Sequence, residues 1–462
     1  MTTRYRTEKD SMGEVRVPAE AYWGAQAQRA VENFPISGLR TDRKLIWATA
    51  AVKRAAALAN RDLGKLDPAL SEYIVRAARE VMEGGLDDQF VVDVFQAGAG
   101  TSHNMNTNEV ITNRALELMG KQRGEYSHCH PNDHVNMSQS TNDVFPTAMR
   151  LAGLASFTEL AREVDLLAGV FRYKAGEFDG IIKSGRTHLQ DAVPIRLGQE
   201  FSGYTAAMEY CMGRLMDAMN ALGELGIGGT AVGTGINSGK GYVALTVKHL
   251  RDITGLDLRP SPNLFFSMQS QAQVLSASGA LRGLAVELIR ISNDLRLLSS
   301  GPLTGLAEIN LPAVQPGSSI MPGKVNPVMA EMTDMVCFQV LGNDHAVAMA
   351  VQAGQLELNV MMPVMAHNLL SSTGILKNTL IVFREKCVAG ITVNEGRCKA
   401  YVDKSLGIAT ALNPFIGYMK AAEVAKEALN SGRSVAEVAR EKGYMTDEEL
   451  RRALDPMRLT EP

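Results

Sequence analysis

The stretch PIRLGQEFSGYTAAMEYCMGRLMDAMNALGEL (194–225) indicates the fold class of this chain. Its apolar residues follow one another at steps of four and three, which places them on one face of a helix. The residues of this stripe are Met208, Met212, Leu215, Met219 and Leu222. We interpret the stripe as the core face of a long helix and not as a cofactor site.

Four more helical patterns of similar length occur in the middle of the chain. They cover 144–178, 270–300, 327–352 and 356–388, and Pro363 is expected to kink the last of them. At 1.5 Å per residue, such helices span roughly 40–50 Å, and rods of this length pack near-parallel as a bundle. A single bundle would leave much apolar surface uncovered, so we expect an oligomer in which bundles pack on each other.

The region before these long helices has a different pattern. Short helical patterns alternate with turns, for example at 44–64 and 71–85, and EVRVP near residue 16 is compatible with a short strand. This part of the chain therefore predicts a separate, mostly helical domain.

The end of the chain predicts a small helical module. Two capping boxes mark helix starts there, Ser434 with Glu437 and Thr446 with Glu449. A length of 462 residues is compatible with about three domains. We therefore expect a mainly α fold of three domains, with a central long-helix bundle. The expected boundaries are 1–140, 141–394 and 395–462.

Composition excludes several functional classes. Lys and Arg number 47 against 50 Asp and Glu, and a net charge of −3 argues against nucleic-acid binding. No run of 18 apolar residues occurs, and the first 18 residues mix both signs of charge without an apolar segment. Five scattered cysteines without a CxxC pair argue against a disulfide framework. We expect a cytoplasmic protein with neither a signal peptide nor a membrane span.

Four polar segments interrupt the otherwise helical sequence, at 96–110, 130–147, 184–194 and 315–327. They are rich in hydroxyl and amide side chains and poor in acids. Such groups, when clustered in a globular protein, need hydrogen-bond partners or a ligand. Many donors with a lysine and a histidine among them suit a small dianion, most simply a dicarboxylate.

The fourth segment is the most specific of the four. Gly317 and Gly323 would make a mobile loop that can place backbone N–H groups against an anion. A serine hydroxyl is normally a weak base, but N–H groups and the ammonium of Lys324 would stabilise the alkoxide of Ser318. The same composition also fits a simple turn between helices.

Two further segments contain expected helix starts. Thr101 would cap a helix that begins near Asn104, and residues 140–142 are natural caps for the helix after Asp143. Because a helix N-terminus also attracts anions, a capping role and a binding role are compatible.

Other signals are weaker. His188 is either a satisfied histidine in a turn or a polar contact and proton carrier in a carboxylate site. Residues 226–241 are rich in glycine but match neither nucleotide-binding pattern. A metal site at 128–134 is conceivable, but Pro131 breaks the helix that would align its histidines.

Taken together, these segments resemble the aspartase/class II fumarase family of the fumarase–argininosuccinate lyase superfamily. GSSIMPGKVNP (317–327) matches the superfamily signature, and GAGTS-NMNTNEV, SQSTND, GRTHLQDAVP, GTAVGTGIN and NPFIGY match as well. The resemblance implies a homotetramer with a shared central bundle, a small dicarboxylate substrate and sites built by three subunits. Several donors and one base would suffice for such chemistry, so we expect no metal and no organic cofactor.

The resemblance also implies roles for individual residues. Ser318 resembles the base that removes a Cβ proton, and Asn142 and His188 resemble contacts to the leaving group. The residues that resemble the holders of the β-carboxylate, as it becomes an aci-carboxylate, are Thr101, Ser140, Thr141 and Ser319. The residues that resemble partners of the other carboxylate are Thr187, Lys324 and Asn326.

Several features favour elimination of ammonia from L-aspartate to give fumarate. Ser102 after Thr101, Thr141 in place of a second serine, and ELMGKQRGEY (117–126) resemble aspartases. These features make an aspartate ammonia-lyase activity our expectation.

Other features point elsewhere. HPND (130–133) resembles a secondary carboxylate site of class II fumarases. Leu303 stands where the family usually has arginine, and residues 263–270 are more apolar than the matching aspartase stretch. The alternatives are therefore a class II fumarate hydratase, a related carbon–nitrogen lyase for another amino acid or an N-substituted aspartate, and a helical scaffold without catalysis.

Overall fold

The computed structural model describes residues 4–461. We expect no signal peptide in the first 18 residues, and residues 1–3 of that stretch lie outside the described range. The chain divides into two compact units, each made of three segments. The first unit comprises Met1–Arg162, Gly213–Ala285 and Phe338–Lys377. The second unit comprises Glu163–Met212, Val286–Cys337 and Asn378–Pro462.

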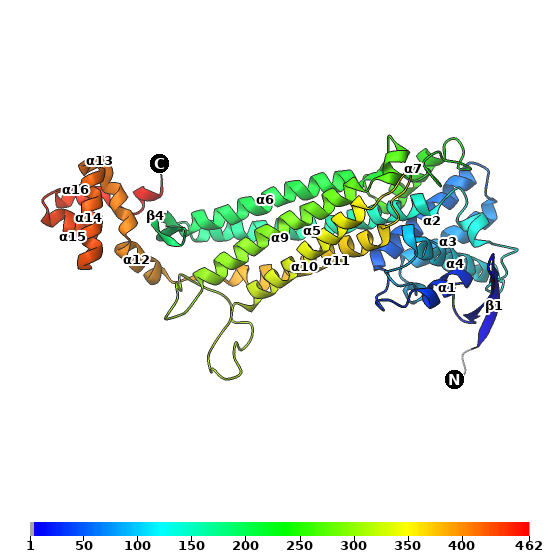
Figure 1. The fold of residues 1–462 in the computed structure, drawn as a ribbon, viewed down its shortest axis with the longest axis horizontal. Helices are drawn as coiled ribbons and strands as arrows, with labels where there is room; N and C mark the ends of the chain where they lie inside the picture. The colour runs from blue at the N-terminus through cyan, green and yellow to red at the C-terminus, as the bar shows by residue number, and fades with distance from the viewer. Residues whose placement is uncertain (1–3, 462) are drawn as a thin grey trace. The chain divides into compact units, whose positions relative to one another are not determined.

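Five long helices supply a segment to each unit (Figure 1). They are α5 (Thr141–Glu177), α6 (Leu197–Leu222), α9 (Ala272–Leu298), α10 (Val328–Gln352) and α11 (Met362–Lys386). The expected mainly α class is confirmed. The kink expected at Pro363 is wrong. Helix α11 begins at Met362, so Pro363 lies in its first turn. There the missing N–H of proline removes no hydrogen bond within the helix, and the helix is not kinked.

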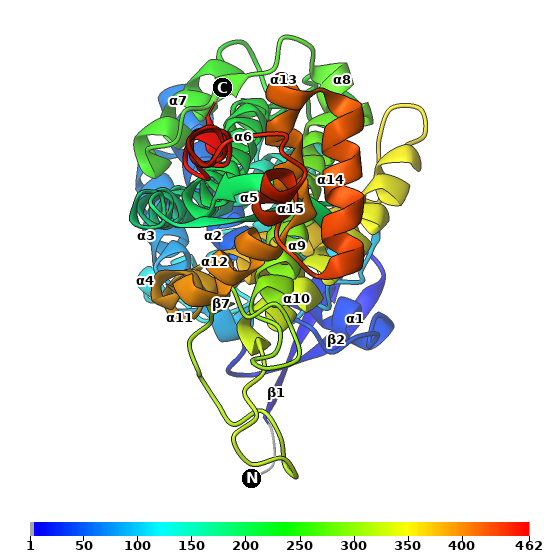
Figure 2. The ribbon, with the colours of Figure 1, turned by 90° about the vertical axis from the view of Figure 1, so that its left-hand side faces the viewer.

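Contacts between side chains show that the helix segments, which Figure 2 views nearly end-on, pack closely inside each unit. In the first unit, a Cβ at Gly153 of α5 would lie 3.3 Å from Leu369 of α11 and 3.4 Å from Leu222 of α6. In the second unit, the rings of Phe171 and Phe201 are 6.3 Å apart. Small residues and aromatic rings thus fill the spaces between these helices.

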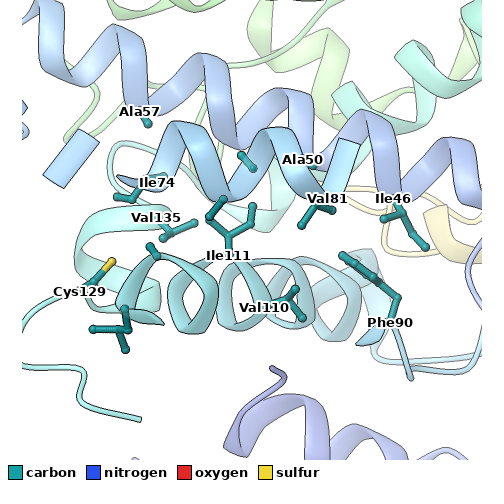
Figure 3. Close-up of a cluster of buried hydrophobic side chains, with 14 of the residues drawn as sticks. Ile46, Ala50, Ala57, Ile74, Val81, Phe90, Val110, Ile111, Cys129 and Val135 are labelled. Carbon is teal, nitrogen blue, oxygen red and sulfur yellow. The ribbon is translucent and has the colours of Figure 1, made fainter. Parts of the chain in front are cut away.

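The first unit has a second core between shorter helices, α2 (Arg43–Asp62), α3 (Pro68–Met82) and α4 (Thr101–Leu118). Figure 3 shows Ile46 and Ala50 of α2 facing Ile111 of α4, with further members of the cluster around them. The helices expected at 44–64 and 71–85 are confirmed. This core holds the second half of α4, through residues such as Val110 and Leu116.

The second unit contains a β-hairpin of β3 (Ile182–Thr187) and β4 (Gln190–Arg196). It also contains the C-terminal module, in which both expected capping boxes are present. The helices of the module are α12 (Glu395–Lys404), α13 (Asn413–Ile416), α14 (Tyr418–Ser431), α15 (Val435–Glu441) and α16 (Asp447–Ala453).

The remaining elements are short. The helices are α1 (Ala25–Asn33), α7 (Tyr242–Thr254) and α8 (Leu264–Gln269). The strands are β1 (Tyr5–Asp10), β2 (Gly13–Pro18), β5 (Glu224–Leu225), β6 (Arg259–Pro260), β7 (Ile309–Asn310) and β8 (Thr392–Val393). The strand expected near residue 16 is β2. Across residues 4–461, every helix is either too short or too polar to cross a membrane.

Candidate active site

The start of α4 is built on an unusual glycine. Thr101 is the first residue of the helix, so our expectation that it caps a helix beginning near Asn104 is wrong. Gly100 precedes it with φ +84°, and a Cβ at that position would lie 2.1 Å from the ring of Phe145 on α5. Only glycine allows this approach, and it brings the starts of α4 and α5 together.

The start of α5 is capped by its own residues. The backbone N–H of Asn142 donates to Ser140 Oγ at 3.2 Å, and that of Ser140 donates to Asp143 Oδ1 at 2.9 Å. The helix begins at Thr141, so the expected start after Asp143 is three residues too late. The capping role expected for Ser140 is confirmed.

The glycine-rich loop 226–241 closes over this helix start. Asp143 Oδ2 accepts the N–H groups of Gly228 at 2.9 Å and Thr230 at 3.0 Å. Asn142 Nδ2 donates to the carbonyl of Ala231 at 2.9 Å. Burial raises the pKa of Asp143 to about 6, although the three N–H donors act against that shift. The loop therefore holds the α5 start instead of a phosphate.

The structure brings four expected site residues together here. Asn104 Nδ2 on α4 donates to Thr141 Oγ1 on α5 at 3.0 Å, which joins the two helix starts that carry Thr101 and residues 140–142. Two adjacent helix N-termini favour a negatively charged ligand. Ser140 also borders an open hollow of about 650 Å³. Residues 132 and 133 of the HPND segment line that hollow too.

The second unit presents His188 at the tip of the β3–β4 hairpin. Thr187 pairs with Gln190 across the hairpin, and His188 and Leu189 form its two-residue turn with φ +55° and +61°. Positive φ at both positions matches the twist of the two strands. Thr187 and His188 are both exposed on this turn.

A buried acid holds the base of this hairpin. Glu308 is fully buried, and its carboxylate lies 2.9 Å from Arg186 Nη1 and 3.2 Å from Lys183 Nζ, both on β3. Two cations compensate the buried charge of Glu308, and Lys183 also lies 3.1 Å from the carboxylate of Glu200. Sequence reasoning missed this group, although a lone acid in the apolar stretch LAEINLP (306–312) was a visible signal.

The loop at 317–326 is closed at its base by its own backbone. The N–H of Gly317 donates to the carbonyl of Lys324 at 2.7 Å, and Asn326 Nδ2 donates to the carbonyl of Gly317 at 2.7 Å. A Cβ at Gly317 would lie 2.5 Å from the Lys324 carbonyl oxygen, so the closure requires glycine.

Ser318 accepts two backbone donors inside this loop. Its Oγ lies 3.2 Å from the backbone nitrogen of Ile320 and 3.0 Å from that of Met321. Donors aimed at an oxygen stabilise its anion. The expected N–H groups around Ser318 are therefore present, while the neighbouring Ser319 and Lys324 are exposed.

Comparisons with known proteins agree with these features. The family described as "Lyase" matches residues 13–342, and the family described as "Fumarase C C-terminus" matches residues 408–461. The chain belongs to the aspartase/class II fumarase family.

Individual members of this family are similar over the whole chain. An aspartate ammonia-lyase of Bacillus subtilis is 51% identical and covers 99% of this chain and 96% of its own length. A class II fumarate hydratase of Halobacterium salinarum is 52% identical, with 100% and 98% covered. The crystal structure of a class II fumarase from Schistosoma mansoni superimposes with a TM-score of 0.97 at 39% identity, covering 99% of each chain.

The family motifs fall into two sets in this chain. The first unit carries Thr101, Ser140, Thr141 and Asn142. The second unit carries Thr187, His188, Ser318, Ser319, Lys324 and Asn326. Among residues 4–461, no three His, Cys, Asp or Glu side chains are grouped as metal ligands would be.

One charged residue near the first set was not singled out from the sequence. Lys53 on α2 is fully buried beneath the α4 and α5 starts. It lies at a helical spacing of four and three with Ile46, Ala50 and Ala57, all of which face the core. A lysine on an apolar stripe was the signal that could have identified it.

Proposed function

We propose that this chain is an ammonia-lyase that converts L-aspartate into fumarate and ammonia. The observation that carries the proposal is the loop of Ser318, in which two backbone N–H groups donate to the serine oxygen. Full-length relatives of this chain include aspartate ammonia-lyases. Thr141 and residues 117–126 favour aspartate as the substrate.

The proposed reaction begins with Ser318 as an alkoxide. It takes the proton from Cβ of L-aspartate, and the electron pair of that bond moves into the β-carboxylate to form an aci-carboxylate. The pair then forms the C=C bond as the C–N bond breaks, and ammonia leaves with the electrons of that bond. The added negative charge needs preorganised donors, each typically worth ~10²–10³ in rate. The proposed donors are Thr101, Ser140, Thr141 and Ser319.

The other end of the substrate has its own proposed contacts. Lys324 supplies a point charge to the second carboxylate, and Asn326 and Thr187 donate hydrogen bonds to it. Asn142 and His188 contact the leaving amino group in this proposal, and a histidine there can carry a proton.

The proposed enzyme is a cytoplasmic homotetramer with composite sites, in which the two sets of residues come from different subunits. Large apolar residues that are at least half exposed on the long helices support assembly. They are Tyr173, Tyr210, Met216, Met335, Phe338 and Met349. The three-domain division at residues 140 and 394 is part of this proposal, as is the absence of nucleic-acid and membrane partners.

A class II fumarate hydratase is the second candidate. Asn132 and Asp133 of the HPND segment line a hollow beside Ser140, as expected of a secondary carboxylate site. A fumarate hydratase is also among the relatives at 52% identity. In that case water and not ammonia would add to the same double bond. Leu303 and residues 263–270 favour a third candidate, a carbon–nitrogen lyase for a related amino acid.

The deciding experiment is the ultraviolet absorbance of fumarate after purified protein is mixed separately with L-aspartate and L-malate. We expect fumarate from L-aspartate, together with an equal amount of ammonia. Fumarate from L-malate alone would establish the hydratase. If neither L-aspartate nor L-malate yields fumarate, N-substituted aspartates and other amino acids are the next substrates to test.

A second experiment tests the composite site. Light scattering and activity are measured on the same samples over a dilution series. We expect a mass near four times 49.9 kDa and a loss of specific activity wherever the mass falls. A fully active monomer would contradict composite sites while leaving the chemistry open.

A further inference from the structure

A buried cation lies behind the proposed carboxylate-binding group. Lys53 Nζ donates to Asn136 Oδ1 and to Gln139 Oε1, both at 2.9 Å. Burial lowers the pKa of Lys53 to about 7, and the negative charge of Asp143 acts against that shift. A buried charge is costly unless it is paired and hydrogen-bonded, so these partners are needed to hold the ammonium.

This ammonium determines which way the neighbouring amides face. An ammonium group has donors only, so it requires the oxygen of Asn136 and not its NH₂. Asn136 Oδ1 then also accepts from Asn104 Nδ2 at 3.3 Å and from Asn108 Nδ2 at 3.2 Å. Both of these asparagines are therefore turned with their NH₂ groups toward Asn136.

The orientation of Asn104 in turn determines the polarity of Thr141. The second N–H of Asn104 Nδ2 donates to Thr141 Oγ1 at 3.0 Å. Because the protein already supplies a donor to this oxygen, the single hydroxyl proton of Thr141 remains free to donate elsewhere. A hydroxyl with a free proton suits a substrate carboxylate.

Two unpartnered atoms show that the arrangement is imposed. Asn104 Oδ1 and Asn108 Oδ1 are buried and accept no hydrogen bond from the described residues. If Asn104 were flipped, its oxygen would accept the Thr141 proton and gain a partner. The observed orientation forgoes that bond, and Lys53 supplies the reason.

We propose that Lys53 is a positioning residue that, through Asn136 and Asn104, turns the hydroxyl proton of Thr141 toward the substrate carboxylate. This inference rests on the proposed function, in which Thr141 holds that carboxylate. Without the ammonium, the amide of Asn136 is held in this orientation on the Nδ2 side only by a 3.4 Å bond to the carbonyl of Gln139. Asn136 and Asn104 can then flip, and Thr141 donates to Asn104 instead of to the substrate.

A double-mutant cycle tests the inference. Lys53→Met and Thr141→Val are made singly and together, and kcat/KM is measured with whichever of L-aspartate or L-malate is turned over. We expect about a tenfold loss for each single variant, the equivalent of one hydrogen bond. In the Thr141→Val background, Lys53→Met should cost less than about threefold, because the proton that it orients is absent.

A matched control separates this role from simple stability. Lys174 is also buried, and its Nζ donates to the carbonyl of Ile391 at 2.9 Å and to Glu177. Lys174→Met should lower the melting temperature but leave kcat/KM within about twofold. Asn104→Ala removes the donor to Thr141 without removing a charge, so it replaces Lys53→Met in the cycle if that variant does not fold.

The outcomes separate the proposed role of Thr141 in binding from the proposed role of Lys53 in positioning. An unchanged kcat/KM in Thr141→Val would overturn the role of Thr141 in the proposed function. A loss in Thr141→Val combined with an equal effect of Lys53→Met, or of Asn104→Ala, in both backgrounds would overturn only the positioning role. A loss that depends on Thr141 supports it.

Discussion

The two regions that carry the proposed chemistry are held in opposite ways. Around the α4 and α5 starts, buried contacts come from distant parts of the chain: Gly100 packs on Phe145, and Asp143 binds loop 226–241. In the loop at 317–326, the hydrogen bonds of Ser318, Lys324 and Asn326 join neighbours within the same loop.

This difference fits two different tasks. Donors for a developing charge are most effective when they are fixed before the reaction. A loop that carries a base, in contrast, must admit substrate and then exclude water, which favours a closed shape with few outside contacts. We infer that the α4 and α5 starts are a rigid receptor and that loop 317–326 moves as one piece.

The largest expected effect is a loss of kcat on substitution of Ser318 in loop 317–326. Ser318→Ala removes the proposed base and should lower kcat by at least ~10², because a positioned base contributes ~10²–10⁴. KM should change little, since the carboxylate contacts remain. Steady-state kinetics measure this, with circular dichroism and light scattering as controls for fold and assembly. Near-normal turnover would remove Ser318 from its role.

Next in size is a comparison of two glycines with positive φ. Gly100→Ala should cost about 2–3 kcal/mol of unfolding free energy, because the new Cβ overlaps the Phe145 ring and the left-handed backbone is strained. Gly323→Ala, with φ +78° and open space around it, should cost about 1 kcal/mol. Urea unfolding at one protein concentration measures both. Equal costs would mean that the receptor is no more rigid than the loop.

The smallest effect concerns His103, which lies inside the receptor. Thr49 Oγ1 donates its only proton to the carbonyl of Leu45 at 2.8 Å, so His103 Nε2, at 2.9 Å, must be the donor to Thr49. His103 Nδ1 is buried and has no partner among the described residues. Burial lowers the pKa of His103 to about 3, and the charge of Lys53 adds to that shift.

Acidification should destabilise the protein through His103. Between pH 6.5 and pH 3 the unfolded chain binds a proton at His103 that the folded chain does not, so acidification favours unfolding. From pH 6.5 to pH 5.5 this group should remove roughly 1 kcal/mol of stability per chain. His103→Leu should reduce the acid-side loss by that amount in urea titrations at both pH values. An identical pH slope in the variant would show that folding does not lower the pKa of His103.

The sequence determined those parts of the molecule that depend on nearby residues. Helical periodicity identified the five long helices, and the capping boxes at Ser434 and Thr446 were confirmed, because a cap bonds only within one turn. The two N–H donors to Ser318 Oγ were also expected, since they come from residues two and three positions further along.

Only the tertiary structure decided the features that join distant positions. Nothing near Thr101 in the sequence shows that the helix begins there, because its start depends on Gly100 packing against Phe145. Lys53 bonds residues more than 80 positions away, so its burial and its influence on Thr141 arise only in the folded chain. Local sequence patterns specify helices. The electrostatic field and the hydrogen-bond directions at a site are set by groups that folding brings together.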